Sequence, residues 1–236
     1  MSTDIQQPAW VRDLRPPSRL WVLLLLLPLV AMLAFAILQP IKILPRIGLA
    51  PGYSLVDQDG NRLTNEALRG SIVIYNFTHT ECAAPCPQTS ETLRDMQAAL
   101  NAVEMGDIPL AFVTISTDPT YDTPEALNAY AKELGANTTR WHFASGDLAQ
   151  LKMISTSFQT RYIQNNDGSF TTDPVFALVD GWGIVRALYH TATPDMKLLQ
   201  HDLQLVVDEA QKSQGINHYA YEAAHLFLCH PFAQRP

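Results

Sequence analysis

The chain has 236 residues, 47% of them hydrophobic, and a formal net charge of −7. That length is enough for a short anchor and one domain of ordinary size. Acidic residues outnumber basic ones, whereas nucleic-acid-binding proteins typically carry a basic surface patch, so we expect no nucleic-acid partner.

An uncharged and almost wholly apolar run covers Leu20–Leu38. Its 19 residues can span a hydrocarbon core of about 30 Å at a rise of about 1.5 Å per residue. Arg12, Arg15 and Arg19 precede the run. Positive charges next to a membrane span favour its cytoplasmic side, so these arginines indicate a cytoplasmic N-terminus. We therefore predict a single-pass protein of the cell membrane with its soluble domain on the extracytoplasmic side. A cleaved signal peptide is the alternative, because residues 34–36 resemble a small-residue cleavage site.

The composition changes along the chain predict five parts. A linker rich in proline and glycine follows the apolar run, and an aromatic, histidine-containing tail ends the sequence. The expected boundaries are a cytoplasmic segment at 1–19, a transmembrane helix at 20–38, a linker at 39–52, a folded domain at 53–213 and a C-terminal extension at 214–236.

Apolar strands alternate with amphipathic helices beyond the linker, which is typical of an α/β fold. The expected strands are Tyr53–Val56 with a return strand near Arg62, then Ile72–Phe77, Leu110–Ser116, Trp141–Phe143, Val175–Val179 and Ile184–Tyr189. The expected helices are Thr89–Val103, a helix that begins at Asp122 or Thr123 and ends at Leu134, Asp147–Phe158 and Asp195–Ala210.

Cys82 and Cys86 are the most informative residues, because two of only three cysteines share one short loop after an expected strand. At this spacing the two sulfurs can form a disulfide or bind one soft metal ion. A helix that starts beside them would stabilise a thiolate, which is both the nucleophile and the metal ligand. We therefore predict a redox or metal site at this loop.

Several ordered stretches resemble the Sco/SenC family of membrane-anchored copper proteins, over about residues 51–210. A CxxxC pair alone is a weak signal, whereas the ordered set is strong. The matching stretches are Tyr53–Gly60 with Leu68–Gly70, Cys82–Pro87, Ser116–Pro119, Asp122–Ala131, Ser145–Asp147 and Ala177–Asp180.

The resemblance implies a thioredoxin-like fold, with a central mixed sheet and helices on both faces, after one transmembrane helix. It also implies one copper ion, held as Cu(I) by Cys82, Cys86 and a distal histidine. Family members assist in building the copper centre of haem–copper oxidases, and some exchange thiols and disulfides. The implied partners are the membrane and a subunit of a respiratory oxidase or another electron-transfer complex.

The sequence departs from the family pattern at the third ligand. The distal histidine normally lies just before the strand that contains Ala177–Asp180, and counting back places Thr172 at that position. Pro174 resembles the cis-proline that faces the redox cysteines in thioredoxin-like oxidoreductases, so we predict a cis bond and a role in the substrate groove.

Other side chains offer a replacement ligand. His79 and His190 are the imidazole candidates, although a structural histidine is favoured at both positions. Asp173 offers only a hard carboxylate, which matches Cu(I) poorly. In the tail, His225, Cys229 and His230 suggest a metal relay, but packing or docking of the tail is favoured because spacing alone gives no ligand geometry.

These observations support three hypotheses. The first is a metallochaperone that assembles a respiratory oxidase and handles Cu(I). The second is a membrane-tethered thiol–disulfide oxidoreductase that uses Cys82 and Cys86 as a redox pair. The third is an accessory subunit of a membrane electron-transfer complex with a degenerate copper site. A metallochaperone is favoured over an enzyme.

Overall fold

The computed structural model describes residues 19–38, 41–80, 90–166, 168–228 and 234–235. The chain separates after Pro40 into two compact units. The predicted cysteine site falls on residues 81–89, so Cys82 and Cys86 lie outside the described residues, as do Cys229 and His230 in the tail.

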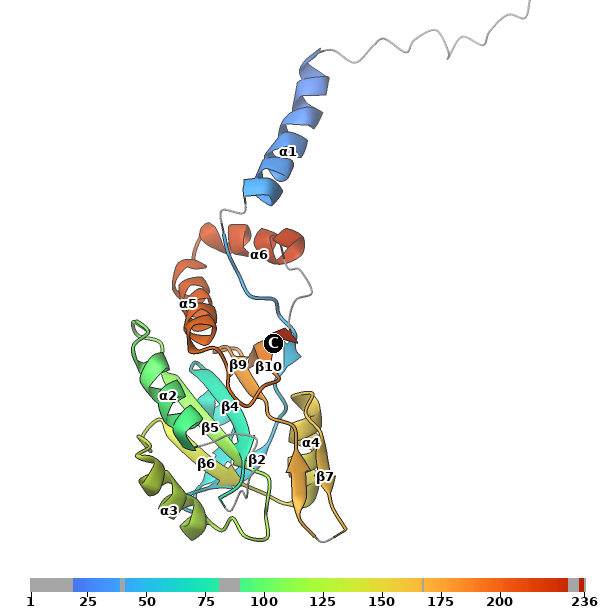
Figure 1. The fold of residues 1–236 in the computed structure, drawn as a ribbon. Helices are drawn as coiled ribbons and strands as arrows, with labels where there is room; N and C mark the ends of the chain where they lie inside the picture. The colour runs from blue at the N-terminus through green and yellow to red at the C-terminus, as the bar shows by residue number, and fades with distance from the viewer. Residues whose placement is uncertain (1–18, 39–40, 81–89, 167, 229–233, 236) are drawn as a thin grey trace, which may run out of the picture. The chain divides into compact units, whose positions relative to one another are not determined.

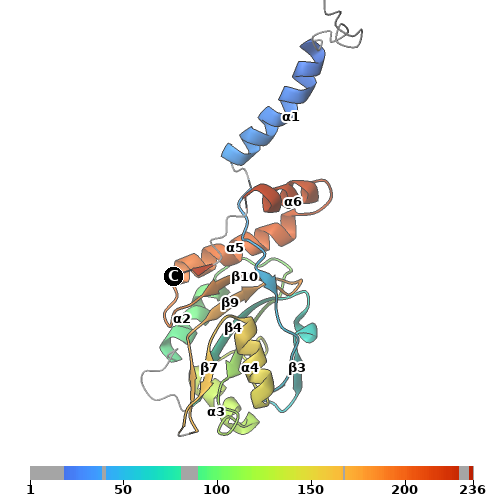
Figure 2. The ribbon, with the colours of Figure 1, turned by 90° about the vertical axis from the view of Figure 1, so that its right-hand side faces the viewer.

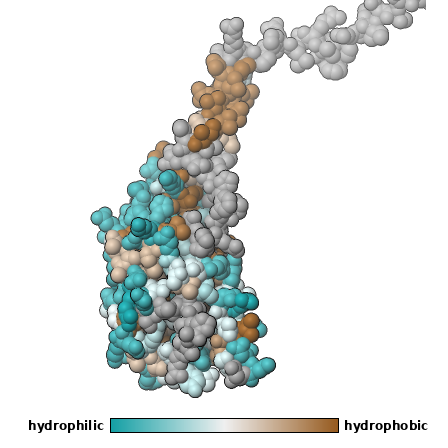
Figure 3. All heavy atoms as spheres, viewed as in Figure 1, coloured by the Kyte–Doolittle hydropathy of each residue, from teal (hydrophilic) through white to brown (hydrophobic). Residues whose placement is uncertain are grey.

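Helix α1, Arg19–Leu38, belongs to the first unit and contains Pro28. Many of its side chains are apolar and exposed, which gives α1 its brown colour in Figure 3. Across the residues described here, no helix meets the length and hydropathy needed to cross a membrane. A helix is thus present over residues 20–38, but its prediction as transmembrane is not confirmed.

The second unit is built on one mixed sheet with the strand order β1-β10-β9-β4-β5-β6-β2-β3. Strands β4, β5 and β6 are parallel to one another, and the other strands in this order are antiparallel to their neighbours. The bounds are β1 Gly48–Leu49, β2 Ser54–Asp57, β3 Arg62–Thr64, β4 Ile72–Thr78, β5 Leu110–Ser116, β6 Trp141–Ser145, β9 Phe176–Val179 and β10 Ile184–Tyr189. Strand β11, Gln234–Arg235, pairs with β10.

Helices cover both faces of this sheet (Figures 1 and 2). Helices α2 (Ser90–Asn101), α3 (Pro124–Leu134) and α5 (Met196–Lys212) pack on one face with the inward side chains of the parallel strands. Helix α4, Leu148–Ser157, covers the other face, where Leu151 and Ile154 join a second apolar cluster. The predicted mixed sheet between helices is therefore confirmed.

Local sequence signals explain several element boundaries. Thr123 caps α3 by accepting a hydrogen bond from the Ala126 backbone N–H, and Pro124 occupies the first turn, as predicted. Gly135 ends α3 with a φ of 70°, a left-handed conformation that glycine adopts without strain. Asp147 and Asp195 cap α4 and α5.

Several elements were not among the predicted ones, including the two-residue strands β1 and β11. A separate hairpin pairs β7 (Tyr162–Gln164) with β8 (Phe170–Thr172), and a short 3-10 helix covers Glu66–Leu68. Strands of three residues with mixed polarity carry little periodic signal, which explains why the hairpin was missed. The predicted extension contains helix α6, Asn217–Leu228, in which Ala224 is buried.

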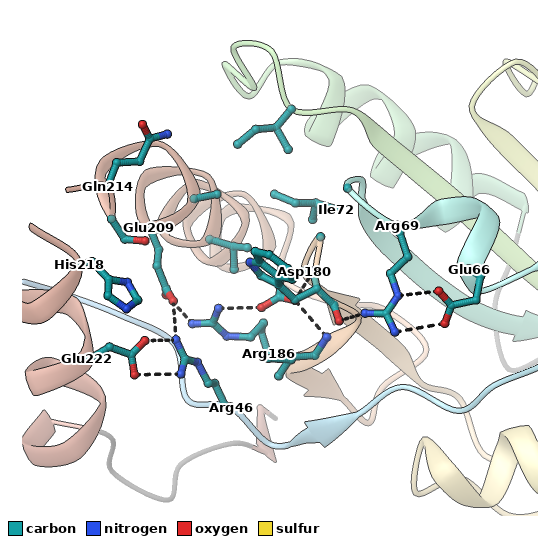
Figure 4. A pocket seen from close by; sticks show the side chains of 18 residues that line it. Arg46, Glu66, Arg69, Ile72, Asp180, Arg186, Glu209, Gln214, His218 and Glu222 are labelled. Carbon is teal, nitrogen blue, oxygen red and sulfur yellow. Dashed lines mark hydrogen bonds and ion pairs between the residues drawn. The ribbon is translucent and has the colours of Figure 1, made fainter.

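Arg186 on β10 is only 2% exposed and is neutralised inside the fold. It donates hydrogen bonds to Asp180 at 3.0 Å and to Glu209 at 2.5 Å. It also donates to the backbone carbonyls of Leu44 at 2.7 Å and Pro45 at 3.2 Å. One guanidinium thus joins the end of β9, helix α5 and the segment that precedes β1 (Figure 4).

Glu209 extends these contacts to α6. Its other oxygen lies 2.9 Å from His225 Nε2 and 3.6 Å from Arg46 Nη2, and Arg46 forms an ion pair with Glu222 at 2.8 Å. Burial by itself would raise the pKa of Glu209, but the hydrogen bonds from His225 and Arg186 prevail and lower it to about 2. The carboxylate is therefore a charged link between the domain and its extension.

The lowered pKa predicts an acid-sensitive contribution to stability. Because the folded-state pKa of about 2 lies below the ordinary value of 4.5, the contribution is complete above about pH 4.5 and is lost as pH falls toward 2. We expect Glu209→Gln to flatten the pH dependence of the unfolding free energy over this range by about 3 kcal/mol. Urea unfolding of the full chain in detergent measures it.

The exposed Glu133 on α3 provides the matched control. Glu133→Gln is expected to keep the pH profile of the parent. Equal slopes for the parent and Glu209→Gln between pH 5 and 2.5 would contradict the role assigned to Glu209.

Candidate functional site

The candidate site lies where β4 ends, because the cysteine loop connects β4 to α2. The structure describes the chain up to Thr80 and again from Ser90, on both sides of the loop. Since β4, β5 and β6 are parallel, the residues that follow all three strands meet at this end of the sheet. The surroundings of the loop can therefore be built from these neighbours.

Asp122 binds the last described residue before the loop to the end of β5. Both of its carboxylate oxygens accept a hydrogen bond from the Thr80 backbone N–H, at 3.3 and 3.2 Å. The hydroxyls of Thr80 and Ser116 also donate to this carboxylate. Asp122 is 2% exposed, so the interaction is sheltered from water.

A second set of contacts holds the preceding two residues. The Thr117 backbone N–H donates to the Thr78 carbonyl at 2.9 Å, and His79 Nδ1 lies 3.2 Å from Thr117 Oγ1. The Tyr162 hydroxyl, on β7, donates to the Thr117 carbonyl at 2.8 Å. His79, a candidate copper ligand, thus has one ring nitrogen engaged with β5, and the unpredicted hairpin supports the same corner.

The register of β9 places Pro174 at this end of the sheet. Phe176 pairs with Asn76 in antiparallel β4, so Pro174, two residues earlier, lies beyond the last pair and beside the end of β4. Pro174 is half-buried. Its position agrees with a groove beside the cysteine loop, while its cis bond and its role in substrate binding stay predictions.

Thr172, at the position expected for the distal histidine, points into the protein. It is 8% exposed, and its Oγ1 has no hydrogen-bond partner among the residues that the structure describes. The neighbouring Thr171 is exposed, in keeping with the alternation along β8. A threonine hydroxyl is a poor ligand for copper compared with imidazole or thiolate. This position therefore does not supply the third ligand.

Asp173 and His190 lie near one another at the same end. Arg161 donates to the two carboxylate oxygens of Asp173 at 2.6 and 2.8 Å. These hydrogen bonds hold the pKa of Asp173 below its usual value, and the charge of the nearby His190 acts in the same direction. His190 follows β10 and is exposed.

The structure thus brings His79, Thr172, Asp173, Pro174 and His190 to one end of the sheet. Within the described ranges, however, no three histidine, cysteine or acidic side chains are grouped so that they could hold a metal ion. The described residues therefore do not identify the third copper ligand that the resemblance implies. In the tail, His225 contacts Glu209, which favours packing over a metal relay.

Two residues of this corner were not predicted as part of the site. Asp122 was expected only as a possible helix cap, although Thr123 takes that position, and Tyr162 was not singled out. The one sequence signal near Asp122 is that Ser116 and Asp122 both belong to stretches that match the family pattern. Tyr162 belongs to the hairpin that periodicity missed.

A cavity of about 980 Å³ lies at the opposite end of β4, near Ile72 (Figure 4). Arg46, Arg69 and Arg186 line it, and each is paired with an acidic side chain. Ile72 and Val206 also line it. Pro174, the predicted site residue that the structure describes, does not line this cavity.

Comparison with known proteins supports the resemblance. The family model described as SCO1/SenC matches residues 45–207. The SCO1 protein homolog of Bacillus subtilis (strain 168) is 28% identical over 94 residues, which are 40% of this chain and 47% of that protein. The chain thus matches about half the length of this relative. A Stutzerimonas stutzeri protein whose name describes copper binding is 30% identical over 190 residues, 77% of this chain and 89% of the relative.

The fold also matches a solved structure. The crystal structure of Arabidopsis thaliana ScoI with copper bound gives a TM-score of 0.57 at 24% identity, covering 69% of this chain and 98% of that chain. This likeness confirms the predicted thioredoxin-like fold. Together with the family match over most of the chain, it shows that the protein belongs to the SCO1/SenC family.

Proposed function

We propose that this protein handles Cu(I), exchanges thiols and disulfides, or does both, through Cys82 and Cys86 while a respiratory haem–copper oxidase is assembled. The observation that carries the proposal is the position of this CxxxC pair, between β4 and α2 of a Sco fold. A relative named for copper binding and a copper-bound Sco structure support copper as the cargo.

The chemistry of the two cysteines suits Cu(I). Thiolates are soft ligands that prefer this ion, whereas Cu(II) binds better when imidazole joins them. Because Thr172 occupies the usual histidine position and its hydroxyl is buried, the pair lacks that support. The protein should therefore favour Cu(I) and release it readily to an acceptor.

The same pair can reduce a partner disulfide. One thiolate attacks a sulfur of that disulfide and forms a mixed disulfide, and the other partner sulfur leaves as a thiolate. The second cysteine then attacks the mixed disulfide, releases the partner as a dithiol and closes Cys82–Cys86. Two electrons pass to the partner, so an acceptor's cysteines would be reduced before they receive copper.

The reduced protein is expected to bind one Cu(I), and Cys82→Ser/Cys86→Ser is expected to lose at least about 100-fold in affinity, because both soft ligands are removed. Competition with a Cu(I)-specific chelator under anaerobic conditions measures the affinity. Cys229→Ser is the matched control and should keep the parent affinity. Equal binding by the double variant and the parent would exclude this site.

Thr172→His is expected to raise Cu(II) affinity by at least about tenfold, since imidazole would replace a hydroxyl that binds copper poorly and has no partner within the described ranges. Thr171→His, on the adjacent exposed position of β8, is the control and should change nothing. Electron paramagnetic resonance of the Cu(II)-loaded variants follows the change in ligands. Identical spectra and affinities for both variants would show that Thr172 does not correspond to the distal ligand.

We further propose that α1 tethers the protein to the cell membrane, with the domain on the extracytoplasmic side. The uncharged run at residues 20–38 and the exposed leucines of α1 support this tether. Protease added to cells with a permeabilised outer barrier should digest the domain, while a cytoplasmic marker protein stays intact. A protected domain, digested only after membrane lysis, would reverse the topology.

An accessory subunit of an electron-transfer complex is the second candidate. It is favoured by Thr172 in place of a ligand and by exposed apolar side chains in the extension, at Ile216 (85% exposed), Tyr219 (75%) and Leu226 (80%). A parent protein that neither binds Cu(I) nor forms a Cys82–Cys86 disulfide, yet purifies with oxidase subunits, would support it.

A further inference from the structure

Helix α6 carries apolar side chains on its outward side. Ile216, which directly precedes the helix, Tyr219 and Leu226 are each at least 75% exposed. Ala223 is half-buried and lies between the last two in sequence. The four residues follow one another at spacings of three, four and three positions, which places them on one side of an α-helix. We call them the apolar stripe, and it contains no charged residue.

The opposite side of α6 is attached to the domain. Ala224 is buried, and Glu222 forms an ion pair with Arg46 at 2.8 Å. His225 Nε2 lies 2.9 Å from an oxygen of Glu209 on α5. Because these three side chains of α6 face inward, they fix the rotation of the helix about its axis. The apolar stripe therefore points away from the domain.

The segment that contacts α6 follows closely on the uncharged run at residues 20–38. The folded unit begins at Ile41, three residues after Leu38 (41 − 38). If the run crosses the bilayer, Ile41 lies within about 11 Å of the lipid surface, the reach of three extended residues. Both ribbon views show α6 beside the segment from Ile41 to Arg46 (Figures 1 and 2), and the ion pair of Arg46 with Glu222 joins the two.

We propose that α6 docks on the surface of the lipid bilayer through the apolar stripe. The inference rests on the membrane tether proposed above and adds a second contact with the membrane, made by the folded domain. Apolar side chains gain free energy by leaving water, and a tyrosine suits the boundary between headgroups and acyl chains. Lipid is favoured over a protein partner as the occupant, because the tether keeps the bilayer within reach of α6 at all times.

Docking through α6 orients the domain on the membrane. His218 and Glu222 of α6 line the same cavity as Ile72, the first residue of β4, so α6 lies at the end of the sheet where β4 begins. Thr78, the last residue of β4, lies six residues further along the strand (78 − 72), a distance of about 20 Å. The docked helix therefore leaves the Thr78 end of the sheet free of lipid.

The experiment places a tryptophan on the stripe of the full chain in nanodiscs of phosphatidylcholine and phosphatidylglycerol. Tyr219→Trp adds the indole, and the emission of the parent is subtracted. Lipids brominated near the headgroup end of the acyl chain should quench the added emission by about half or more, because a docked stripe enters this layer. Tyr121→Trp is the matched control, since Tyr121 is exposed and follows β5 at the Thr78 end. Its added emission should stay unquenched.

A second pair of variants tests whether the stripe itself makes the contact. In the Tyr219→Trp background, Ile216→Gln/Leu226→Gln should abolish the quenching, because two apolar anchors become polar. Leu148→Gln/Ile163→Gln changes the same two residue types at exposed positions of α4 and β7 and should leave the quenching unchanged. Circular dichroism verifies that each variant keeps the fold.

The outcomes separate this inference from the tether on which it rests. If carbonate extracts the parent from cell membranes, both are overturned. If the parent stays in the membrane but Tyr219→Trp is quenched no more than Tyr121→Trp, only the docking of α6 is overturned. The same holds if quenching survives Ile216→Gln/Leu226→Gln, or if purified oxidase subunits rather than lipid shield the added tryptophan. Selective quenching that the glutamine pair abolishes supports docking on lipid.

Discussion

The buried guanidinium of Arg186 is the interaction on which one end of this domain depends. Taking an arginine out of water is costly, and removing any one partner of such a group leaves another charge unpaired. Asp180 and Glu209 neutralise Arg186, and two backbone carbonyls of the segment before β1 accept further hydrogen bonds from it. Because these partners come from the end of β9, from α5 and from the segment before β1, the charge balance requires the three to come together.

This arrangement assigns different tasks to the two ends of the sheet. At the end where β4 begins, ion pairs connect the segment before β1, helix α5 and helix α6 to one another. At the end where β4 finishes, backbone and hydroxyl groups hold Thr78, His79 and Thr80 with few full charges. The ion-paired end supports the fold, and the loop with the predicted cysteine site follows β4 at the other end.

Much of the fold could be predicted because its central strands are continuous apolar runs. β4 and β5 are buried along their entire lengths, so short uncharged segments without Gly or Pro identified them. The helices α3 and α5 carried both caps and periodic apolar positions. The β7–β8 hairpin could not be predicted in this way, because its strands are short and its pairing depends on tertiary contacts such as Tyr162 with Thr117.

The site was only partly predictable for a related reason. Spacing along the chain located the cysteine pair, Pro174 and the substituted Thr172. It could not show that Thr172 is buried and that its hydroxyl finds no partner in the described part of the chain, or that Arg161 forms an ion pair with Asp173. Asp122 is the clearest example of what spacing cannot show. It accepts hydrogen bonds from Thr80 and Ser116, which are distant from each other in sequence and meet only through the parallel pairing of β4 and β5.

Two of the buried acids of the domain, Glu209 and Asp122, differ in the groups that compensate their charge. Glu209 is surrounded by Arg186, Arg46 and His225, so its charge is cancelled locally and serves cohesion. Within the described residues, Asp122 forms no ion pair, and its hydrogen bonds come from two hydroxyls and a backbone N–H. Charged partners therefore join the elements around Glu209, whereas neutral donors hold the chain at the end of β4 against the segment that follows β5.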